Sequence, residues 1–324
     1  MVAHEPRQLP VRLDLASAES GLGFALRALR ANGIPFDRGM QWLGLERHRP
    51  VERQAVIRIA WALNVDADQW GGRMVTRDLG GKGWVRLAGQ RFRRQVASNR
   101  LYAKLCPQCI RERGIARLSW LLRATVGCPW HGYSLITACQ RCGQGISWDR
   151  PDIDICHCGY PFKAVSAAPP LEPPIRAWLC WLESSLCPDG LPAAALMATR
   201  EMPSALTHLS VDGAFRIIEA MGLFAEPNAS VRSAIAMCAT LPARGSVIAR
   251  GLDRLQAIEA DPAVVPRFSA VVYQCALIQL ANDYATQEDH ALAWWLLNGL
   301  RSGIDPGLTR AGSRPRGQLP LFLT

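Results

Sequence analysis

Eight residues between positions 106 and 158 constrain the fold more than any other feature of this chain. In order, they follow the pattern C-x2-C-x18-C-x2-H-x7-C-x2-C-x13-C-x-C. Thiols and imidazoles in such tight pairs are typical of structural zinc sites, in which each pair forms a knuckle and two pairs complete a tetrahedron. We therefore predict two zinc ions, held by Cys106, Cys109, Cys128, His131, Cys139, Cys142, Cys156 and Cys158.

The sequence leaves open which pairs share an ion. Consecutive pairing gives one site of three thiolates and one imidazole, completed by His131, and a second site of four thiolates. The long spacer after Cys109 favours this arrangement, because a helix there would return the chain to its first pair. An interleaved arrangement would instead join the first ligand pair with the third and the second with the fourth. His157 could also replace either of the cysteines beside it.

The spacing predicts structural rather than catalytic zinc. A catalytic zinc keeps one position open for water and has a carboxylate base nearby, whereas four protein ligands saturate each site here. The sequence contains no H-E-x-x-H or H-x-E…P-C-x-x-C signature, Walker lysine motif, G-x-S-x-G elbow or dinucleotide fingerprint. Its carboxylates are scattered, and none marks a metal-binding group of a nuclease or recombinase. We therefore expect a protein that is not an enzyme.

Positive charge is concentrated around the cysteine block. The formal net charge is +10, and between positions 77 and 123 twelve basic residues stand against two acidic ones, so this window carries all of it. Arginine forks bind phosphate or carboxylate groups bidentately, which suits nucleic acid or an acidic protein patch. Trp84 and Trp148 could stack on a base or a peptide. The candidate contact residues are Arg91, Arg93, Arg94, Arg100, Lys104, Arg111, Arg113, Arg117 and Arg123.

Helical periodicity flanks this block on both sides. Apolar residues at helical spacing predict a helix over 20–33, with Ser20 as its N-cap, and another over 51–64. Helices of this size indicate a helix-turn-helix-like domain. The glycine-rich stretch 70–104 predicts a basic, loop-rich bridge with one short strand. Six further helical patterns follow a proline-rich linker, with N-caps expected at Ser210 and Thr286.

These patterns define the expected fold class, which is mainly α with small zinc-knuckle or zinc-ribbon-like α+β modules. We expect a helix-turn-helix-like N-terminal domain with its basic bridge at 1–104 and a double zinc-finger module at 105–162. A linker at 163–176 would lead to a helical, helix-turn-helix-like C-terminal domain at 177–324. The sequence shows neither a membrane-spanning apolar run nor a secretory signal, so we expect a cytoplasmic protein with reduced thiols.

The block LCPQCI…SWLLRATVGCPWHGYSLITACQRCG…CHCG resembles the signature of the TniQ family of transposition target-selection proteins. The N-terminal LPVRLDLASAESGLGFALRALRANGI is similar to the opening of that family through Glu19, Ser20, Leu26, Leu29 and Asn32-Gly33, although the usual Trp of that helix is absent. The resemblance covers residues 9 to about 162. In the block, the matching positions are Cys106, Pro107, Cys109, Trp120, Cys128, Pro129, His131, Gly132, Leu135, Cys139, Cys142, Gly143, Cys156, Cys158 and Gly159.

The resemblance implies a non-catalytic adaptor in DNA transposition. Family members connect target recognition to an AAA+ transposition regulator, TnsC or TniB, which recruits the transposase. Some bind a DNA attachment site through helix-turn-helix units, and others dock, sometimes as dimers, on an RNA-guided CRISPR complex such as Cascade. Two alternatives stay open from the residues alone. One is a stand-alone sequence-specific DNA-binding regulator that uses the helices at 51–64 and 268–303, and the other is a zinc enzyme acting on nucleic acid.

Overall fold

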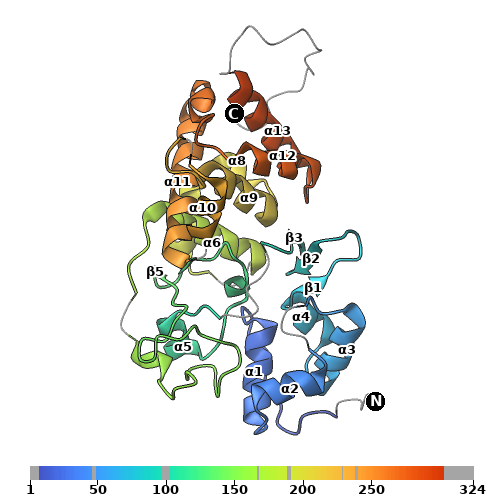
Figure 1. Cartoon of the computed structure of the whole chain (residues 1–324). Coiled ribbons are helices and arrows are strands. Elements are labelled where there is room, and N and C mark those ends of the chain that lie inside the picture. Colours follow the sequence, from blue (N-terminus) through green and yellow to red (C-terminus); the bar gives the residue numbers. More distant parts are fainter. Residues whose placement is uncertain are drawn as a thin grey trace. The chain divides into compact units, whose positions relative to one another are not determined.

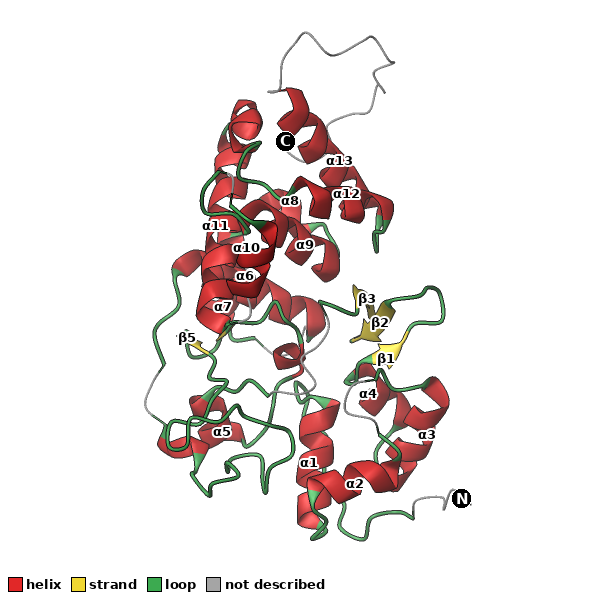
Figure 2. Cartoon of the chain, viewed as in Figure 1, coloured by secondary structure: helices red, strands yellow, loops and turns green. Residues whose placement is uncertain are grey.

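The computed structural model describes residues 7–45, 49–96, 103–165, 168–187, 191–227, 229–237 and 240–302. These residues form two compact units, one built from 1–171 and 182–195 and the other from 172–181 and 196–324 (Figure 1). Among the described residues, helices dominate and the few strands are short (Figure 2). The mainly helical character of the predicted fold class is therefore confirmed, whereas its helix-turn-helix and zinc-module parts stay predictions.

The first unit opens with four helices, α1 (Gly21–Ala31), α2 (Phe36–Leu43), α3 (Arg53–Ala62) and α4 (Ala67–Gly72). Ser20 caps α1 as predicted, because its Oγ accepts a hydrogen bond from the Gly23 N–H at 3.1 Å. The apolar face of α1 is buried throughout. Gly39 allows α2 to pack closely on that face, since a Cβ at this position would clash with Leu29. The helices predicted over 20–33 and 51–64 are thus present as α1 and α3.

A three-stranded antiparallel sheet follows, in the order β1 (Thr76–Arg77), β2 (Trp84–Leu87) and β3 (Gln90–Arg93). Ala88 and Gly89 have φ angles of 50° and 74°, so both central residues of the β2–β3 turn are left-handed, as a tight hairpin requires. The prediction of a single strand in this stretch was wrong. Strands of two to four residues contain too few positions to show a clear alternation, and glycines interrupt the pattern between them.

The cysteine block itself contains little regular structure. Its elements are helix α5 (Pro107–Arg113), the 3₁₀ helix η1 (Leu118–Leu121), strands β4 (Gly127–Cys128) and β5 (Tyr133–Ser134), and the 3₁₀ helix η2 (Phe162–Ala164). The helix expected across the long spacer after Cys109 was therefore wrong. Gly114 ends α5 with a left-handed φ of 60°, and beyond it Trp120 and Leu121 are buried at 2% exposure in a single 3₁₀ turn.

The remaining elements are helical. They are α6 (Pro173–Leu186), α7 (Ala193–Ala198), η4 (Thr199–Glu201), α8 (Ser204–Thr207), α9 (Val211–Gly222), α10 (Val231–Met237), α11 (Leu241–Ala260), η5 (Pro262–Phe268), α12 (Gln274–Asn282) and α13 (Gln287–Ser302). Helix α6 begins inside the stretch predicted as linker. Its first-turn prolines are compatible with a helix, because the N–H groups of the first turn have no partner within the helix.

The second unit packs around α9, which contacts α11, α12 and α13. Ser210 caps α9 through the Gly213 N–H at 2.9 Å, and Thr286 Oγ1 accepts a hydrogen bond from the Asp289 N–H at 3.4 Å, so both predicted N-caps are confirmed. The buried Asp289 carboxylate also accepts hydrogen bonds from the Ser210 hydroxyl at 2.7 Å and the Thr286 N–H at 3.0 Å. One carboxylate thus joins the starts of α9 and α13.

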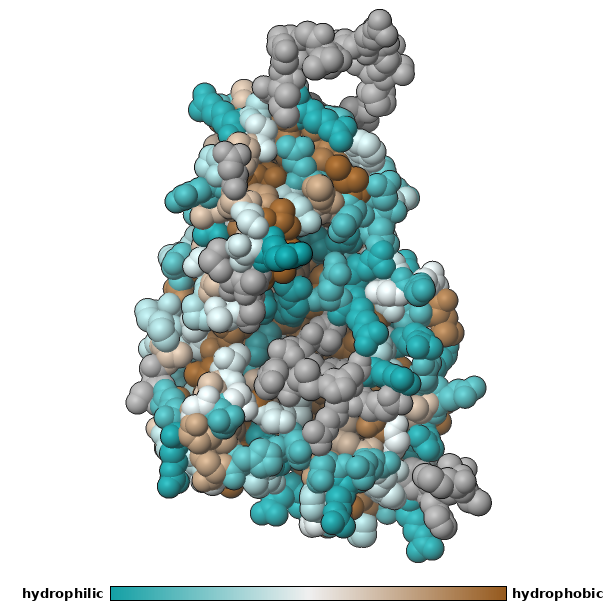
Figure 3. All heavy atoms as spheres, in the orientation of Figure 1, coloured by the Kyte–Doolittle hydropathy of each residue, from teal (hydrophilic) through white to brown (hydrophobic). Residues whose placement is uncertain are grey.

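Hydrophobic residues also reach the surface of the second unit. On the face drawn in Figure 3 they form patches among hydrophilic residues over the C-terminal helices. Ile278 on α12 and Trp294 on α13 are 38% and 39% exposed. Among the described residues, no helix combines the length and the apolar character that a membrane crossing requires.

Candidate metal centres

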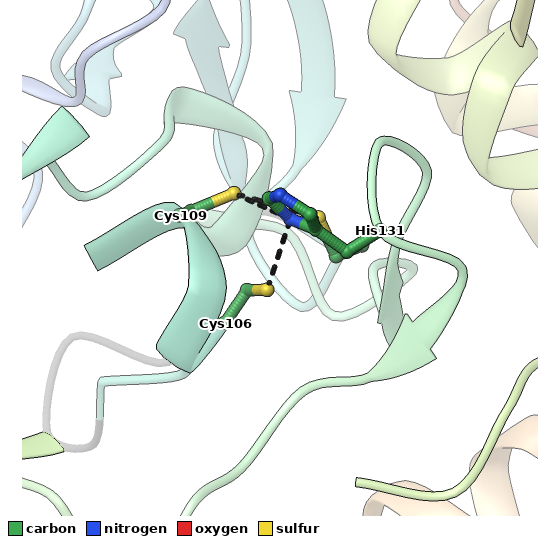
Figure 4. A group of neighbouring side chains, drawn as sticks. Cys106, Cys109 and His131 are labelled. Atoms are coloured by element: carbon green, nitrogen blue, oxygen red, sulfur yellow. Dashed lines mark hydrogen bonds between the residues drawn. The ribbon is translucent and has the colours of Figure 1, made fainter. Parts of the chain in front are cut away.

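The first set of predicted ligands meets at one point. Cys106 and Cys109 lie at the start of α5, Cys128 ends β4, and His131 lies in the turn between β4 and β5. Nδ1 of His131 is 3.4 Å from each of the three sulfurs (Figure 4), and the sulfurs of Cys109 and Cys128 are 3.5 Å apart. A tetrahedral zinc with bonds of about 2.3 Å to sulfur and about 2.0 Å to nitrogen separates its ligand atoms by about 3.5–3.8 Å. The set therefore fits one zinc ion.

The second set forms a similar cluster from loop residues. The sulfurs of Cys139 and Cys158 are 3.7 Å apart, and those of Cys142 and Cys156 are 3.9 Å apart. Gly143 has a φ of 72° directly after a ligand, which allows the chain to turn back as a knuckle requires. All four ligand atoms lie within 4.8 Å of one another, so this set also fits one tetrahedral ion.

Each set consists of consecutive ligands. The structure therefore has the sequential grouping, and the interleaved alternative is not the one found. His157 is not part of the second set. It is exposed, and it lines a cavity of about 470 Å³ together with Arg30 and Arg150.

The thiols of the first set perturb one another strongly. Hydrogen bonds with Cys109 and Cys128 lower the pKa of Cys106 to about 2. Contacts with Cys106 and Cys109 raise the pKa of Cys128. Without a cation, one sulfur can ionise beside the S–H groups of its neighbours, and a second or third thiolate at this distance would be repelled. A bound cation removes that repulsion, because zinc binds all its cysteine ligands as thiolates.

Glu112 completes the surroundings of the first set. Its Oε2 lies 3.0 Å from His131 Nε2, so the carboxylate accepts the imidazole N–H and leaves the Nδ1 lone pair directed at the sulfurs. Metal-binding histidines are commonly held by a carboxylate in this way. Glu112 was not among the residues predicted from the sequence. Its position three residues after Cys109 on the same helix could have indicated it, since residues three apart share a helix face.

The nine candidate contact residues occupy different environments. Arg94, Arg111 and Arg113 are exposed, and Arg91, Arg93 and Arg123 are half-buried. Arg100 lies outside the described residues. Lys104 is 4% exposed and Arg117 1% exposed, so the structure contradicts a surface role for these two. The Lys104 ammonium instead donates hydrogen bonds to the carbonyl groups of Leu122 and Thr125.

Arg117 is enclosed by an aromatic ring and a carboxylate. Its guanidinium lies 3.1 Å from the centre of the Trp130 ring, and Nη1 is 3.6 Å from Oε1 of Glu183, a residue of α6 that is also 1% exposed. Burial raises the pKa of Glu183 to about 7. A buried arginine of this kind ties the chain before η1 to the end of α6, within the first unit.

The two tryptophans proposed for stacking are also buried. Trp84 is 6% exposed and Trp148 4% exposed, so neither presents a free ring to a base or a peptide. The guanidinium groups of Arg91 and Arg93 cover Trp84, at 4.6 and 4.8 Å from the ring centre. The expected stacking role is therefore wrong for both residues.

Fold and site together describe a mainly helical protein with two clusters of four Cys or His residues that could each hold a metal ion, and an arginine-rich segment between its helices. A comparison with protein families finds a match. Residues 10–135 match the family described as TniQ, so the sequence resemblance is confirmed over this region. The match includes α1–α4, β1–β3 and the whole first ligand set. A search of curated proteins found no match. A TniQ region implies a transposition-associated role, as an adaptor or as a DNA-binding protein.

Proposed function

We propose that this chain is a non-catalytic TniQ-type adaptor in DNA transposition, acting in the cytoplasm. It links recognition of a target site to an AAA+ regulator of the TnsC or TniB kind. The target is read either as a DNA site or through an RNA-guided Cascade complex with its guide RNA, by one copy of the chain or by a homodimer. The observation that carries this proposal is the TniQ match over residues 10–135, with its complete first ligand set.

Both ligand sets support a structural role for the metal ions that they would hold. Each offers four protein ligands to one ion, which leaves no position for a reacting water. Zinc bound there would cross-link loop segments that have little regular structure, and binding of this kind contributes on the order of 10 kcal/mol of folding free energy per site. The zinc ions would hold the TniQ fold, and the contacts with partners would come from the surrounding side chains.

A stand-alone DNA-binding regulator is the second candidate, and the basic side chains of β2 and β3 favour it. DNA binding alone does not separate the two functions, because some adaptors also bind DNA. Association with an AAA+ regulator does separate them. Gene neighbourhood would supply the regulator to test, and neighbouring CRISPR genes would identify the targeting route.

The test is a pull-down with the affinity-tagged full chain. We expect it to retain the AAA+ ATPase encoded beside it, and not an unrelated AAA+ ATPase of similar size. Zinc-depleted chain is the matched control, and it should lose the interaction. Absence of any association between the zinc-loaded chain and its neighbouring ATPase would count against the adaptor and in favour of the regulator.

A further inference from the structure

The register of the small sheet gathers basic side chains on one of its faces. Arg86 pairs with Arg91, and Trp84 pairs with Arg93. Directly opposite residues of an antiparallel pair point to the same face, so all four side chains share it. We define the arginine face as Arg86, Arg91 and Arg93.

The opposite side of the sheet belongs to the core. Val85 and Leu87 are 1% exposed and Phe92 is fully buried. This alternation fixes the orientation of the sheet, because a slip of one residue in the pairing would bury the arginines and expose the apolar side chains. The arginine face therefore points away from the core.

One carboxylate lies among the arginines of this face. Asp78 pairs with two of them, with Oδ2 2.5 Å from Arg91 Nε and Oδ1 3.6 Å from Arg86 Nε. Asp78 thus lies between the two arginines that are directly opposite each other in the sheet. Like charges directly opposite each other across two strands destabilise a sheet. An anionic oxygen between Arg86 and Arg91 relieves this repulsion, as Asp78 does here and as a phosphate oxygen could.

The guanidinium groups are held in place in the absence of a ligand. Arg91 and Arg93 lie over the Trp84 ring at 4.6 and 4.8 Å. Arg93 Nη1 also donates a hydrogen bond to the Lys82 carbonyl at 3.2 Å, and Arg86 Nη1 donates one to the Gly89 carbonyl at 3.3 Å. Side chains ordered in advance lose less conformational entropy on binding. The guanidinium groups of this face are thus already positioned to bind an anion.

We propose that the arginine face binds the phosphodiester backbone of duplex DNA. The inference rests on the proposed function, which places the chain at a DNA target. Fixed guanidinium groups suit phosphates, and backbone contacts position a protein on a duplex. A single strand fits less well, because single-stranded nucleic acid is held by exposed aromatic rings. Trp84, the aromatic side chain of this face, is 6% exposed beneath two guanidinium groups.

Asp78 acts on the same face as a competitor of DNA. Its carboxylate lies between Arg86 and Arg91, where a phosphate oxygen would bind, and it also accepts the Gly80 N–H at 3.0 Å. Asparagine can keep the contact with Gly80 through its amide oxygen while losing the negative charge. Asp78→Asn should therefore strengthen DNA binding, an effect opposite to that of any arginine substitution on this face.

The experiment measures binding of the full zinc-loaded chain to a short labelled DNA duplex at a series of salt concentrations. The double variant Arg86→Gln/Arg93→Gln should bind more weakly and reduce the slope of log affinity against log salt by about two. Asp78→Asn should bind several-fold more tightly than the unaltered chain. Arg77→Gln is the matched control, because Arg77 is 58% exposed on β1 but pairs with Val85 and so points to the other face. It should change the slope by less than one.

Each contrary outcome has a distinct meaning. An unchanged slope in the double variant, tighter binding to the single strand than to the duplex, or binding of polyglutamate in place of DNA would each overturn the proposal. The last result would assign the face to an acidic protein. Loss of this inference leaves the adaptor function standing if the chain still retains its AAA+ partner. Failure of that association with intact DNA binding would instead overturn the adaptor and leave the arginine face as proposed.

Discussion

Glu112 is the residue outside the ligand sets that bears most directly on metal affinity. Its carboxylate holds the Nε2–H of His131 at 3.0 Å and so fixes which imidazole nitrogen faces the three sulfurs. Glu112→Ala should lower the zinc affinity of the first site about 10- to 100-fold, as loss of such supporting groups does elsewhere. Competition with a chromophoric chelator measures this. Asp154→Asn, which removes a carboxylate 3.7 Å from Lys163, is the control, and equal affinities in both variants would contradict the role of Glu112.

Glu183 should make stability depend on pH. Burial raises its pKa from 4.5 to about 7 against the opposing effect of Arg117. The folded state then holds the proton more tightly than the unfolded state does. The contribution of Glu183 to the free energy of unfolding is therefore complete below about pH 4.5 and is lost as the pH rises through about 7. The loss is at most about 1.4 kcal/mol per pH unit.

Glu183→Gln should remove that dependence. Urea denaturation of both proteins at about pH 5.5 and about pH 7.5 isolates the effect, because titration of the zinc ligands is common to both. The unaltered chain should lose more stability than the variant over this interval. An identical loss in the two proteins would show that Glu183 does not take up a proton on folding.

At the residue scale, local chemistry could be predicted and burial could not. The spacing of the eight ligands predicts their role, because a knuckle is made within three or four residues. Arg117 and Lys104 occur in the same basic window as exposed arginines, and nothing nearby in the sequence distinguishes them. Their burial depends on distant partners, such as Glu183 on α6.

At the scale of elements, the crossing of α9 and α11 depends on two glycines. A Cβ on Gly222 would clash with the carbonyl oxygen of Val247, and one on Gly251 would clash with that of Ile218. Gly222→Ala and Gly251→Ala should each lower the free energy of unfolding of the second unit by about 1–3 kcal/mol or more.

Gly245→Ala on the same helix is the control for these variants. The nearest atom to its added Cβ is Ile175 Cδ1 at 3.8 Å, an ordinary contact. This substitution should be neutral or stabilise by about 0.5–1 kcal/mol, because alanine favours the helix. Chemical denaturation monitored by helical circular dichroism compares the three variants. Equal effects would mean that the close helix crossing is absent.

Long periodic elements could be predicted from the sequence, and short ones could not. The apolar spacing in α1 indicates its extent and Ser20 its start, because both signals lie within the helix. The strands of the sheet β1–β3 have four or fewer residues each. Their pairing is fixed by a turn with a left-handed Ala88, a conformation that an alanine in the sequence does not predict. The prediction of a helix across the spacer after Cys109 failed for a related reason, since Gly114 ends α5 after two turns.

At the scale of the whole molecule, both ligand sets lie in the first unit. Metal removal should therefore act locally. With a strong chelator, hydrogen exchange in residues 103–165 should become fast, whereas α9 and α11 should keep their protection, because their packing involves no ligand. Mass spectrometry of peptides from the exchanged chain resolves the two units. Simultaneous loss of protection in both units would show that they fold as one.

Two separate zinc centres are the central prediction for this chain, and its metal content tests them directly. Elemental analysis of the purified chain should give about two zinc ions per chain. Cys128→Ser and Cys139→Ser, each removing a ligand from one set, should each leave about one. A single zinc in the unaltered chain, or loss of both ions on altering either set, would contradict two independent four-ligand sites.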